Sequence, residues 1–323
     1  HQDRATPGLR EVWRVGRLLS FSEIAKKSIE ELLESLLSFL KHSSIGHISA
    51  EERYIDQHLG GQIIGIPDHF WNEPSQDASH AKATASRNLM GLRAVLRPLM
   101  SRLSERAQKQ LERSLKVIES ADIERDNPLG VGAPENKQVA AHYVREHIDT
   151  LSKSLDSAIA GIGANEIVLV PDTNALLYNL DIARFGEPIG IDAFTVVLVP
   201  SVVREVDKHK YGGNEKLKRK ATTASNMIKE FRRRGSIVDG VKVEANAYIR
   251  AIPNEPKFDE AWSDLDPQVP DDRMLASILE LRVQNPQARV ALITRDNLAA
   301  MRAEVHRIST LEPPAPSIRS GQS

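Results

Sequence analysis

Apolar residues recur at different spacings in the two halves of this 323-residue chain. From about Ser20 to Gly161 they return every three or four positions, the spacing of amphipathic helices, and no β-branched run of strand length interrupts them. The pattern predicts helices at Ser20–His42, Ala81–Leu103, Glu105–Ser120 and Lys137–Ile159. We therefore expect an all-α domain in this half.

From about Gly161 on, short β-branched runs alternate with helical patterns. The runs IVLVP, AFTVVLVP and ARVALI resemble buried strands, each followed by a helix, and SIVDGVKVEANAYI resembles one further strand. Such alternation predicts an α/β domain, an α/β/α sandwich with a parallel sheet and right-handed crossovers. We place a helical regulatory or specificity domain at 1–163, the α/β domain at 164–311, and a disordered Pro- and Ser-rich tail at 312–323.

The composition narrows the class of protein. With 41% hydrophobic and 27% charged residues, the chain has enough apolar material for a sizeable core. Cysteine is absent, which excludes disulfides and thiolate zinc sites and suits a cytoplasmic location. No apolar run approaches the ~20 residues that span a bilayer, so we expect no membrane partner.

Four acidic residues stand at the ends or starts of predicted elements. Asp172, Glu205 and Asp296 come just after the three β-branched runs, and Asp272 opens an apolar helical pattern. Ligands bind beyond the carboxyl ends of the strands in an open parallel sheet, so these acids should converge there. Hard divalent cations take carboxylate oxygens as ligands, and such cations assist phosphodiester hydrolysis.

Each acid taken alone also has an ordinary structural interpretation. Asp172 could cap a helix, Glu205 could be a solvated helix residue, and Asp296 could form a turn. Their order, their spacing and their flanking elements together favour a metal site.

The same residues resemble the PIN domain, a family of magnesium- or manganese-dependent nucleases, over Ile167 to Thr310. Asp172 matches the first acid of the family and Glu205 the second. The resemblance assigns supporting roles to three residues. Asn174 steadies the site, and Ser201 is the N-cap of the helix that carries Glu205. Thr294 precedes the fourth acid, Asp296.

The third acid is a choice between two adjacent residues. Asp272 fits the spacing of the family motif to Leu275 and Ala276, so we choose it as the ligand. Adjacent helical residues point about 100° apart, which leaves Asp271 a supporting role through water.

The resemblance implies a four-acid site for Mg²⁺ or Mn²⁺ that hydrolyses RNA, an endoribonuclease. It further implies products with a 5′-phosphate and a 3′-hydroxyl. One alternative keeps the fold and acts on DNA or flap structures. Another, of a different class, is a catalytically weak scaffold protein that binds nucleic acid.

A basic segment follows the second acid. Residues 208–234 contain ten Lys or Arg against Glu215 and Glu230, although the whole chain has a net charge of -1. Such a patch can bind a polyanion, and the alternative is a solvated helix face. The expected RNA contacts are Lys208, Lys210, Lys216, Lys218, Arg219 and Lys220.

The first predicted helix carries one long apolar face. We interpret this face as intramolecular core, and the alternative is an interface for a second copy of the chain or a regulatory partner. Its residues are Ile24, Ile29, Leu32, Leu33, Leu36, Leu37 and Leu40.

Overall fold

The computed structural model describes residues 18–47, 69–120, 136–258 and 264–316. The chain divides into two compact units. Among the described residues, those between 23 and 161 form a helical unit, and 18–22 together with those from 162 to 316 form a C-terminal unit. Of the helical domain predicted at 1–163, residues 1–17, 48–68 and 121–135 lie outside the described residues.

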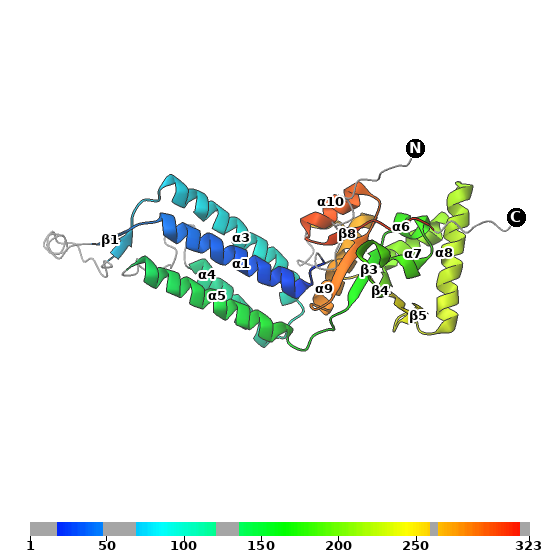
Figure 1. Cartoon of the computed structure of the whole chain (residues 1–323), viewed down its shortest axis with the longest axis horizontal. Helices are drawn as coiled ribbons and strands as arrows, with labels where there is room; N and C mark the ends of the chain where they lie inside the picture. Colours follow the sequence, from blue (N-terminus) through cyan, green and yellow to red (C-terminus); the bar gives the residue numbers. More distant parts are fainter. Residues whose placement is uncertain (1–17, 48–68, 121–135, 259–263, 317–323) are drawn as a thin grey trace, which may run out of the picture. The chain divides into compact units, whose positions relative to one another are not determined.

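The helical unit consists mainly of long helices that run alongside one another (Figure 1). Their cores are the apolar faces predicted from the helical spacing, and Leu32, Leu92, Leu111 and Leu151 are fully buried. A short antiparallel ribbon, which the sequence did not predict, adds the strands β1 and β2. The elements are α1 (Phe21–His42), β1 (Ile45–His47), β2 (His69–Trp71), α3 (Gln76–Met100), α4 (Glu105–Ser120) and α5 (Lys137–Ile159).

The apolar face of α1 is part of this core. Ile24, Ile29, Leu32, Leu36 and Leu40 are each at most 5% exposed. The interpretation of this face as intramolecular core is therefore confirmed for these residues.

The C-terminal unit is built on a six-stranded, mostly parallel sheet with the order β5-β6-β4-β3-β7-β8. The strands β6, β4, β3, β7 and β8 are parallel, and β5 pairs with β6 in antiparallel fashion. The strands are β3 (Ile167–Pro171), β4 (Ala193–Leu198), β5 (Val241–Glu244), β6 (Asn246–Ala251), β7 (Arg289–Ile293) and β8 (Ser309–Leu311).

Helices cover this sheet (Figure 1). Short 3-10 turns, η4 (Ile182–Arg184) and η5 (Glu187–Ile189), lie between α6 and β4. The helices are α6 (Thr173–Tyr178), α7 (Pro200–His209), α8 (Glu215–Arg234), α9 (Pro270–Gln284) and α10 (Asn297–Val305). The predicted α/β architecture with a helical N-terminal part is confirmed.

The strand order places a crevice at the carboxyl end of β3. From β3 the chain proceeds to β4 and β6 on one side, and then returns to β7 and β8 on the other side. Loops leave β3 and its neighbours in opposite directions at such a switch point, which opens a binding crevice beyond the carboxyl ends of the strands. The fold therefore brings the residues that follow β3, β4 and β7 to one edge of the sheet.

Two sequence predictions are corrected in this unit. The segment SIVDGVKVEANAYI forms the hairpin of β5 and β6 rather than one strand, because Ala245 turns the chain with a φ of 41° next to a register shift in the pairing. Residues 312–316 are not disordered: the Pro314 carbonyl accepts a bond from Asn179 Nδ2 at 3.2 Å, and the Ala315 carbonyl one from Arg184. The rest of the predicted tail, 317–323, lies outside the described residues.

Within the described residues, no helix is long and apolar enough to cross a membrane.

The central strand should be sensitive to truncation. Leu169 of β3 is fully buried, so L169A should lower the free energy of unfolding by about 2 to 5 kcal/mol through lost contacts and a cavity. Leu298 is 60% exposed, and L298A is the matched control, with an expected change within about 0.5 kcal/mol. Urea unfolding measures both, and equal effects would contradict a core centred on β3.

Candidate functional site

Asp172 directly follows β3 and caps the next helix. Its Oδ1 accepts a hydrogen bond from the Ala175 backbone N–H at 2.5 Å, so the side chain is the N-cap of α6. Its Oδ2 accepts a hydrogen bond from the Thr294 hydroxyl, which comes from the end of β7. With 7% exposure, this carboxylate is held in one orientation at the carboxyl edge of the sheet.

Asp296 is joined to the same hydroxyl. Its backbone N–H donates to Thr294 Oγ1 at 2.9 Å, and its Oδ1 caps α10 by accepting bonds from the N–H groups of Leu298 and Ala299. Unlike Asp172, this residue is exposed. Thr294 therefore connects Asp172, which follows β3, with Asp296, which follows β7.

Glu205 lies on α7, the helix that follows β4. Its Oε2 accepts a hydrogen bond from the Thr173 hydroxyl at 2.6 Å, and its Oε1 lies 3.6 Å from His209 Nε2. Thr173 is the neighbour of Asp172, so this bond holds the second acid beside the first one. The Glu205 side chain is 45% exposed and can still reach solvent or a ligand.

The helix that carries Glu205 does not begin as predicted. Its N-cap is Val199, and Pro200 occupies the first helical position. Ser201 is therefore inside the first turn rather than at the cap, and its buried hydroxyl has no hydrogen-bond partner among the described residues. Proline suits this position because its missing N–H would be unpaired there anyway.

The two adjacent aspartates of α9 have different surroundings. Asp272 is 1% exposed: its Oδ2 accepts the Asp266 backbone N–H at 2.9 Å, and its Oδ1 forms an ion pair with Arg302 that lacks hydrogen-bond geometry. Asp271 is only half-buried and lies within electrostatic reach of Asp296 and Glu205. Asp271 is therefore the more accessible of the two aspartates, and the choice of Asp272 from the sequence as the third acid stays a prediction.

Burial and neighbouring charges raise the pKa values of Asp172 and Asp271. Burial is the main cause that raises the pKa of Asp172, and the charges of Asp296 and Asp271 add to it, while the hydrogen bonds from Thr294 and Ala175 act in the opposite direction. The pKa of Asp271 is also raised, first by burial and then by Asp296 and Glu205. Close carboxylates that both ionise repel each other, and a cation would relieve the repulsion.

Residues 169–313 match the family model described as the PIN domain. The C-terminal half of the chain is a PIN domain. PIN domains have a nuclease-type fold and are generally metal-dependent nucleases. No family model matches the N-terminal part, and no curated protein matches the chain.

The acids of the PIN domain suit a hard cation in their chemistry. They offer only carboxylate oxygens, which hard divalent cations prefer. Among the described residues, however, no three His, Cys, Asp or Glu side chains are close enough to enclose an ion. Mg²⁺ commonly keeps several waters and uses one or two carboxylates, so an open arrangement of this kind fits such an ion.

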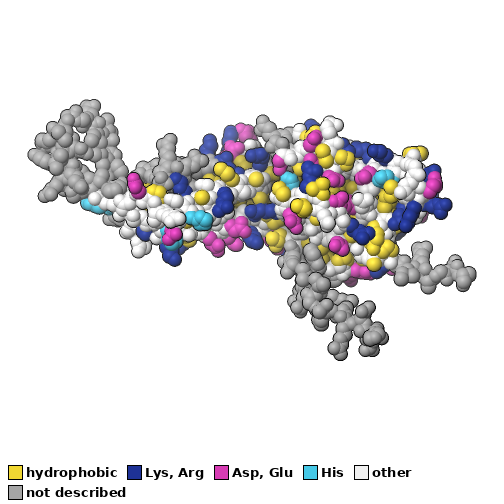
Figure 2. Space-filling view, turned by 90° about the horizontal axis from the view of Figure 1, so that it is seen from above, with side chains coloured by type: hydrophobic (Ala, Val, Ile, Leu, Met, Phe, Trp, Pro, Cys, Tyr) yellow, Lys and Arg dark blue, Asp and Glu magenta, His cyan; other side chains and the backbone are white. Residues whose placement is uncertain are grey.

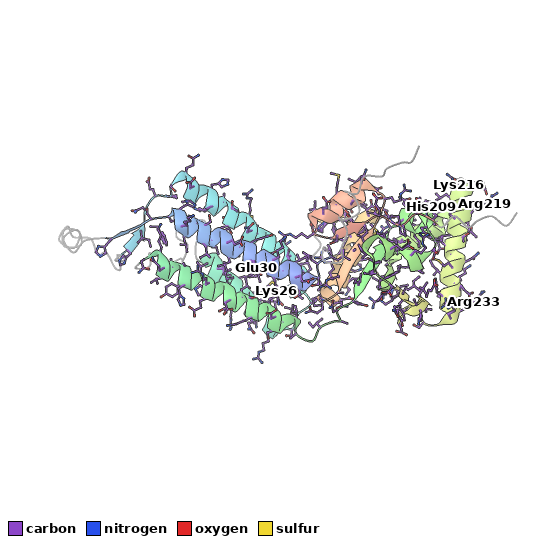
Figure 3. All side chains as sticks on the ribbon, viewed as in Figure 1. Lys26, Glu30, His209, Lys216, Arg219 and Arg233 are labelled. Atoms are coloured by element: carbon purple, nitrogen blue, oxygen red, sulfur yellow. The ribbon has the colours of Figure 1, made fainter. Side chains whose placement is uncertain are left out.

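The basic segment runs from α7 along α8. Lys and Arg side chains occur at the end of the PIN domain where α8 lies, on the face drawn in Figure 2. Figure 3 shows Lys216 and Arg219 near one end of α8 and Arg233 near the other. These side chains are exposed.

The six side chains predicted to contact RNA are not equally available to bind an anion. Lys210 bonds Asp207 at 2.8 Å and Ser225 at 3.2 Å, and Lys218 pairs with Glu215 at 3.4 Å. Lys208, Lys216, Arg219 and Lys220 form no ion pair within the described part of the chain. These four side chains are the stronger candidates for binding an anion.

Asn174, one of the four predicted supporting residues, lines a pocket of about 410 Å³ together with Asp296. Lys220 was predicted as an RNA contact and lines the same pocket. The sequence reasoning missed its remaining lining residues, Leu177, Tyr178, Leu217 and Arg295. Arg295 directly precedes Asp296, so adjacency to a predicted acid was the available signal.

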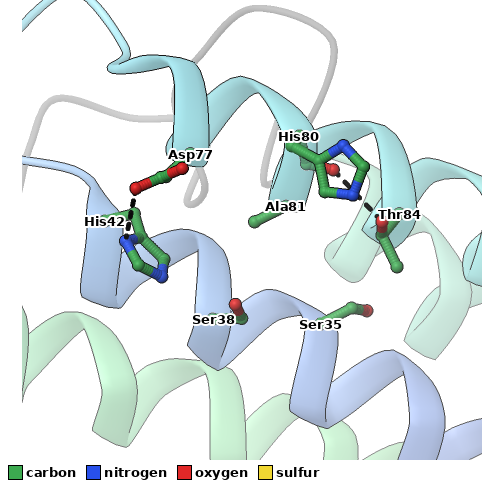
Figure 4. Close-up of a pocket in the computed structure, with 7 residues that line it drawn as sticks. All are labelled: Ser35, Ser38, His42, Asp77, His80, Ala81 and Thr84. Atoms are coloured by element: carbon green, nitrogen blue, oxygen red, sulfur yellow. Dashed lines mark hydrogen bonds and ion pairs between the residues drawn. The ribbon is translucent and has the colours of Figure 1, made fainter.

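A second pocket, of about 340 Å³, lies between α1 and α3 of the helical unit (Figure 4). His42 Nδ1 is 3.9 Å from Asp77 Oδ2 on one side of it, and the Thr84 hydroxyl donates to the His80 carbonyl on the other. Both contacts are exposed and ordinary for helix surfaces. We assign no chemistry to this pocket.

Neutralising Asp271 should stabilise the metal-free protein. Its folded-state pKa is raised, so its contribution to stability is fully present below the unfolded pKa and is lost as the pH rises through the folded pKa. At pH 7 without divalent ions, D271N should therefore raise the melting temperature, and this gain should vanish near pH 3. Calorimetry at both pH values tests this. D239N, at an exposed position outside the cluster, is the control, and a destabilised D271N at pH 7 would contradict the electrostatic picture.

Proposed function

We propose that the PIN domain is a metal-dependent endoribonuclease. The observation that supports this best is the set of carboxylates that follow β3 and β7 or lie on α7 and α9. Two of them, Asp172 and Asp271, have pKa values that are raised first by burial and then by the charges of neighbouring acids. Carboxylates with shifted pKa values are more common at functional sites than elsewhere.

The proposed ligands for one or two Mg²⁺ or Mn²⁺ ions are Asp172, Glu205, Asp271 and Asp296. When bound, such an ion neutralises charge on the phosphoryl oxygens and lowers the pKa of a bound water. Asp272 takes a positioning role, because its ion pair with Arg302 and its bond to the Asp266 backbone fix the first turn of α9.

The protein contributes orientation. The Thr294 hydroxyl holds Asp172 and the backbone of Asp296, and the Thr173 hydroxyl holds Glu205. Because these bonds are made inside the protein, the carboxylates are in place before substrate binds. Preorganised charges stabilise a transition state without further rearrangement.

The proposed reaction is hydrolysis in which a water oxygen bonds to phosphorus as the bond from phosphorus to the 3′ oxygen breaks. The 3′ oxygen takes a proton, and the water leaves its own proton in the crevice. The products then carry a 5′-phosphate and a 3′-hydroxyl. No side-chain nucleophile is needed in this reaction.

We propose RNA as the substrate, held along α8 by its free cations, with DNA or flap structures as the alternative for the same site. The cytoplasmic location and the regulatory partner or second copy at the helical unit stay predictions.

D172N tests the active site. The amide keeps a cap for α6 but removes the charge, so cleavage of labelled RNA with Mn²⁺ should fall by about 100-fold or more, equivalent to about 2.7 kcal/mol. Circular dichroism checks that the variant is folded, and D239N is the control. Cleavage by D172N at the wild-type rate, with the same products, would rule out the proposed site. Parallel reactions on single-stranded DNA and a flap substrate decide between the substrate classes.

Charge reversal on α8 tests the binding surface. Lys216 and Arg219 are three residues apart and share one helix face, so K216E with R219E should weaken RNA binding. At about 50 mM salt the loss should be at least tenfold, and it should shrink as salt is raised because the contacts release counterions. The matched control reverses two exposed lysines of the same domain, Lys242 and Lys257. An equal loss in the control would show that only net charge matters.

A further inference from the structure

A pocket lies beside the acidic cluster in the PIN domain. It has a volume of about 410 Å³, and Asp296, one of the proposed metal ligands, forms part of its wall. The other lining residues come from α6, α8 and the turn after β7: Asn174, Leu177, Tyr178, Leu217, Lys220 and Arg295. Neither the catalytic proposal nor the family match assigns a role to this pocket.

Arg295 and Tyr178 form a cation–π pair in its wall. The guanidinium carbon of Arg295 lies 4.0 Å from the centre of the Tyr178 ring, well within the range of a cation–π contact. Arg295 is exposed and forms no ion pair with a described carboxylate, although Asp296 is its neighbour in sequence. The planar guanidinium is thus held against an aromatic ring while its charge stays available.

The rest of the wall adds one cation, two apolar side chains and an amide. Lys220 comes from α8 and has no ion pair among the described residues. Leu177 and Leu217 supply apolar surface, and the exposed Asn174 supplies a donor and an acceptor. A flat cationic pair, a second cation, apolar walls and an amide are the groups that bind the base and the phosphate of a nucleotide.

We propose that this pocket binds one unpaired nucleotide of the substrate strand, next to the phosphate that is cleaved. The base stacks on the Arg295–Tyr178 pair, and Lys220 and Arg295 neutralise the adjoining phosphate. The location rests on the proposed nuclease function, because Asp296 belongs both to the pocket and to the proposed metal site.

The pocket also defines a substrate class. A base inside a duplex is stacked on its neighbours and paired, so its faces are not available to a protein side chain. Stacking on Arg295 and Tyr178 therefore requires a single-stranded segment at the cleavage position. The preference does not depend on the identity of the base, because every base has a π face.

Binding of labelled oligonucleotides to the full chain in EDTA tests the proposal without cleavage. The ligands are a single-stranded RNA, the same sequence as DNA, an abasic oligomer of equal length and a duplex. R295A should bind both single strands about five- to tenfold more weakly than the wild type, since the stacked contact is lost. R295K keeps the charge but not the planar group, so it should also bind weakly, whereas Y178F should bind as the wild type does.

The control is K242A, which removes one positive charge at an exposed position of β5 outside the pocket. It should change single-strand binding less than twofold. On the abasic oligomer and the duplex, R295A and K242A should differ little, because neither ligand offers a free base. Melting temperatures show whether each variant is folded.

Three results would overturn the pocket: R295A equal to K242A on single strands, full recovery of binding in R295K, or an equal loss for R295A on single strands and duplex. These results are separate from a failure of the nuclease proposal. A wild-type protein that never cleaves, but loses single-strand binding in R295A, would refute the catalysis and keep the pocket. If the wild type cleaves RNA and R295A binds single strands as K242A does, the pocket is refuted and the nuclease proposal is kept.

Discussion

The hydroxyl of Thr294 holds the candidate site together. It donates to Asp172 at the end of β3 and accepts the backbone N–H of Asp296 just beyond β7. The backbones on both sides are fixed as well, because Asp172 N–H bonds the Ile293 carbonyl and Thr294 N–H bonds the Leu311 carbonyl. The backbones that carry the two carboxylates cannot move apart without breaking the parallel ladder, so the sheet keeps the two acids at neighbouring positions.

This constraint explains why the adjacent aspartates of α9 differ. A further buried carboxylate near the cluster needs compensation, and Asp272 receives it from Arg302 and the Asp266 backbone. Asp271 has no such cation of its own, and its pKa is raised by its acidic neighbours even though Arg302 acts against the shift. The charge of Asp271 thus lowers the stability of the folded protein, whereas that of Asp272 is compensated. A bound cation would remove this cost.

The sequence was sufficient for elements whose pattern is local. The strand at Ile167–Pro171 could be predicted because β-branched residues on a fully buried strand form a continuous run. The common position of the acids after the strands could be predicted from the parallel topology. The different surroundings of Asp271 and Asp272 could not be predicted from the sequence, because they depend on Arg302, which lies thirty residues further along the chain. The Arg295–Tyr178 pair was hidden for the same reason, since stacking across β7 and α6 leaves no periodic signal.

Charge separation would let a chain with a net charge of -1 bind the proposed polyanion. Surface charges are screened over about 8 Å at physiological salt, so a strand responds to the local surface and not to the total. Along α8 that surface is cationic, while Asp172 and Asp296 lie at the carboxyl edge of the sheet. Lys220 belongs to both regions, because it is on α8 and also lines the pocket beside Asp296. A strand bound along this helix would therefore reach the acids at Lys220, and a cation bound among the carboxylates would lower the repulsion between these acids and the phosphates of the strand. Binding of metal and of substrate should then favour each other.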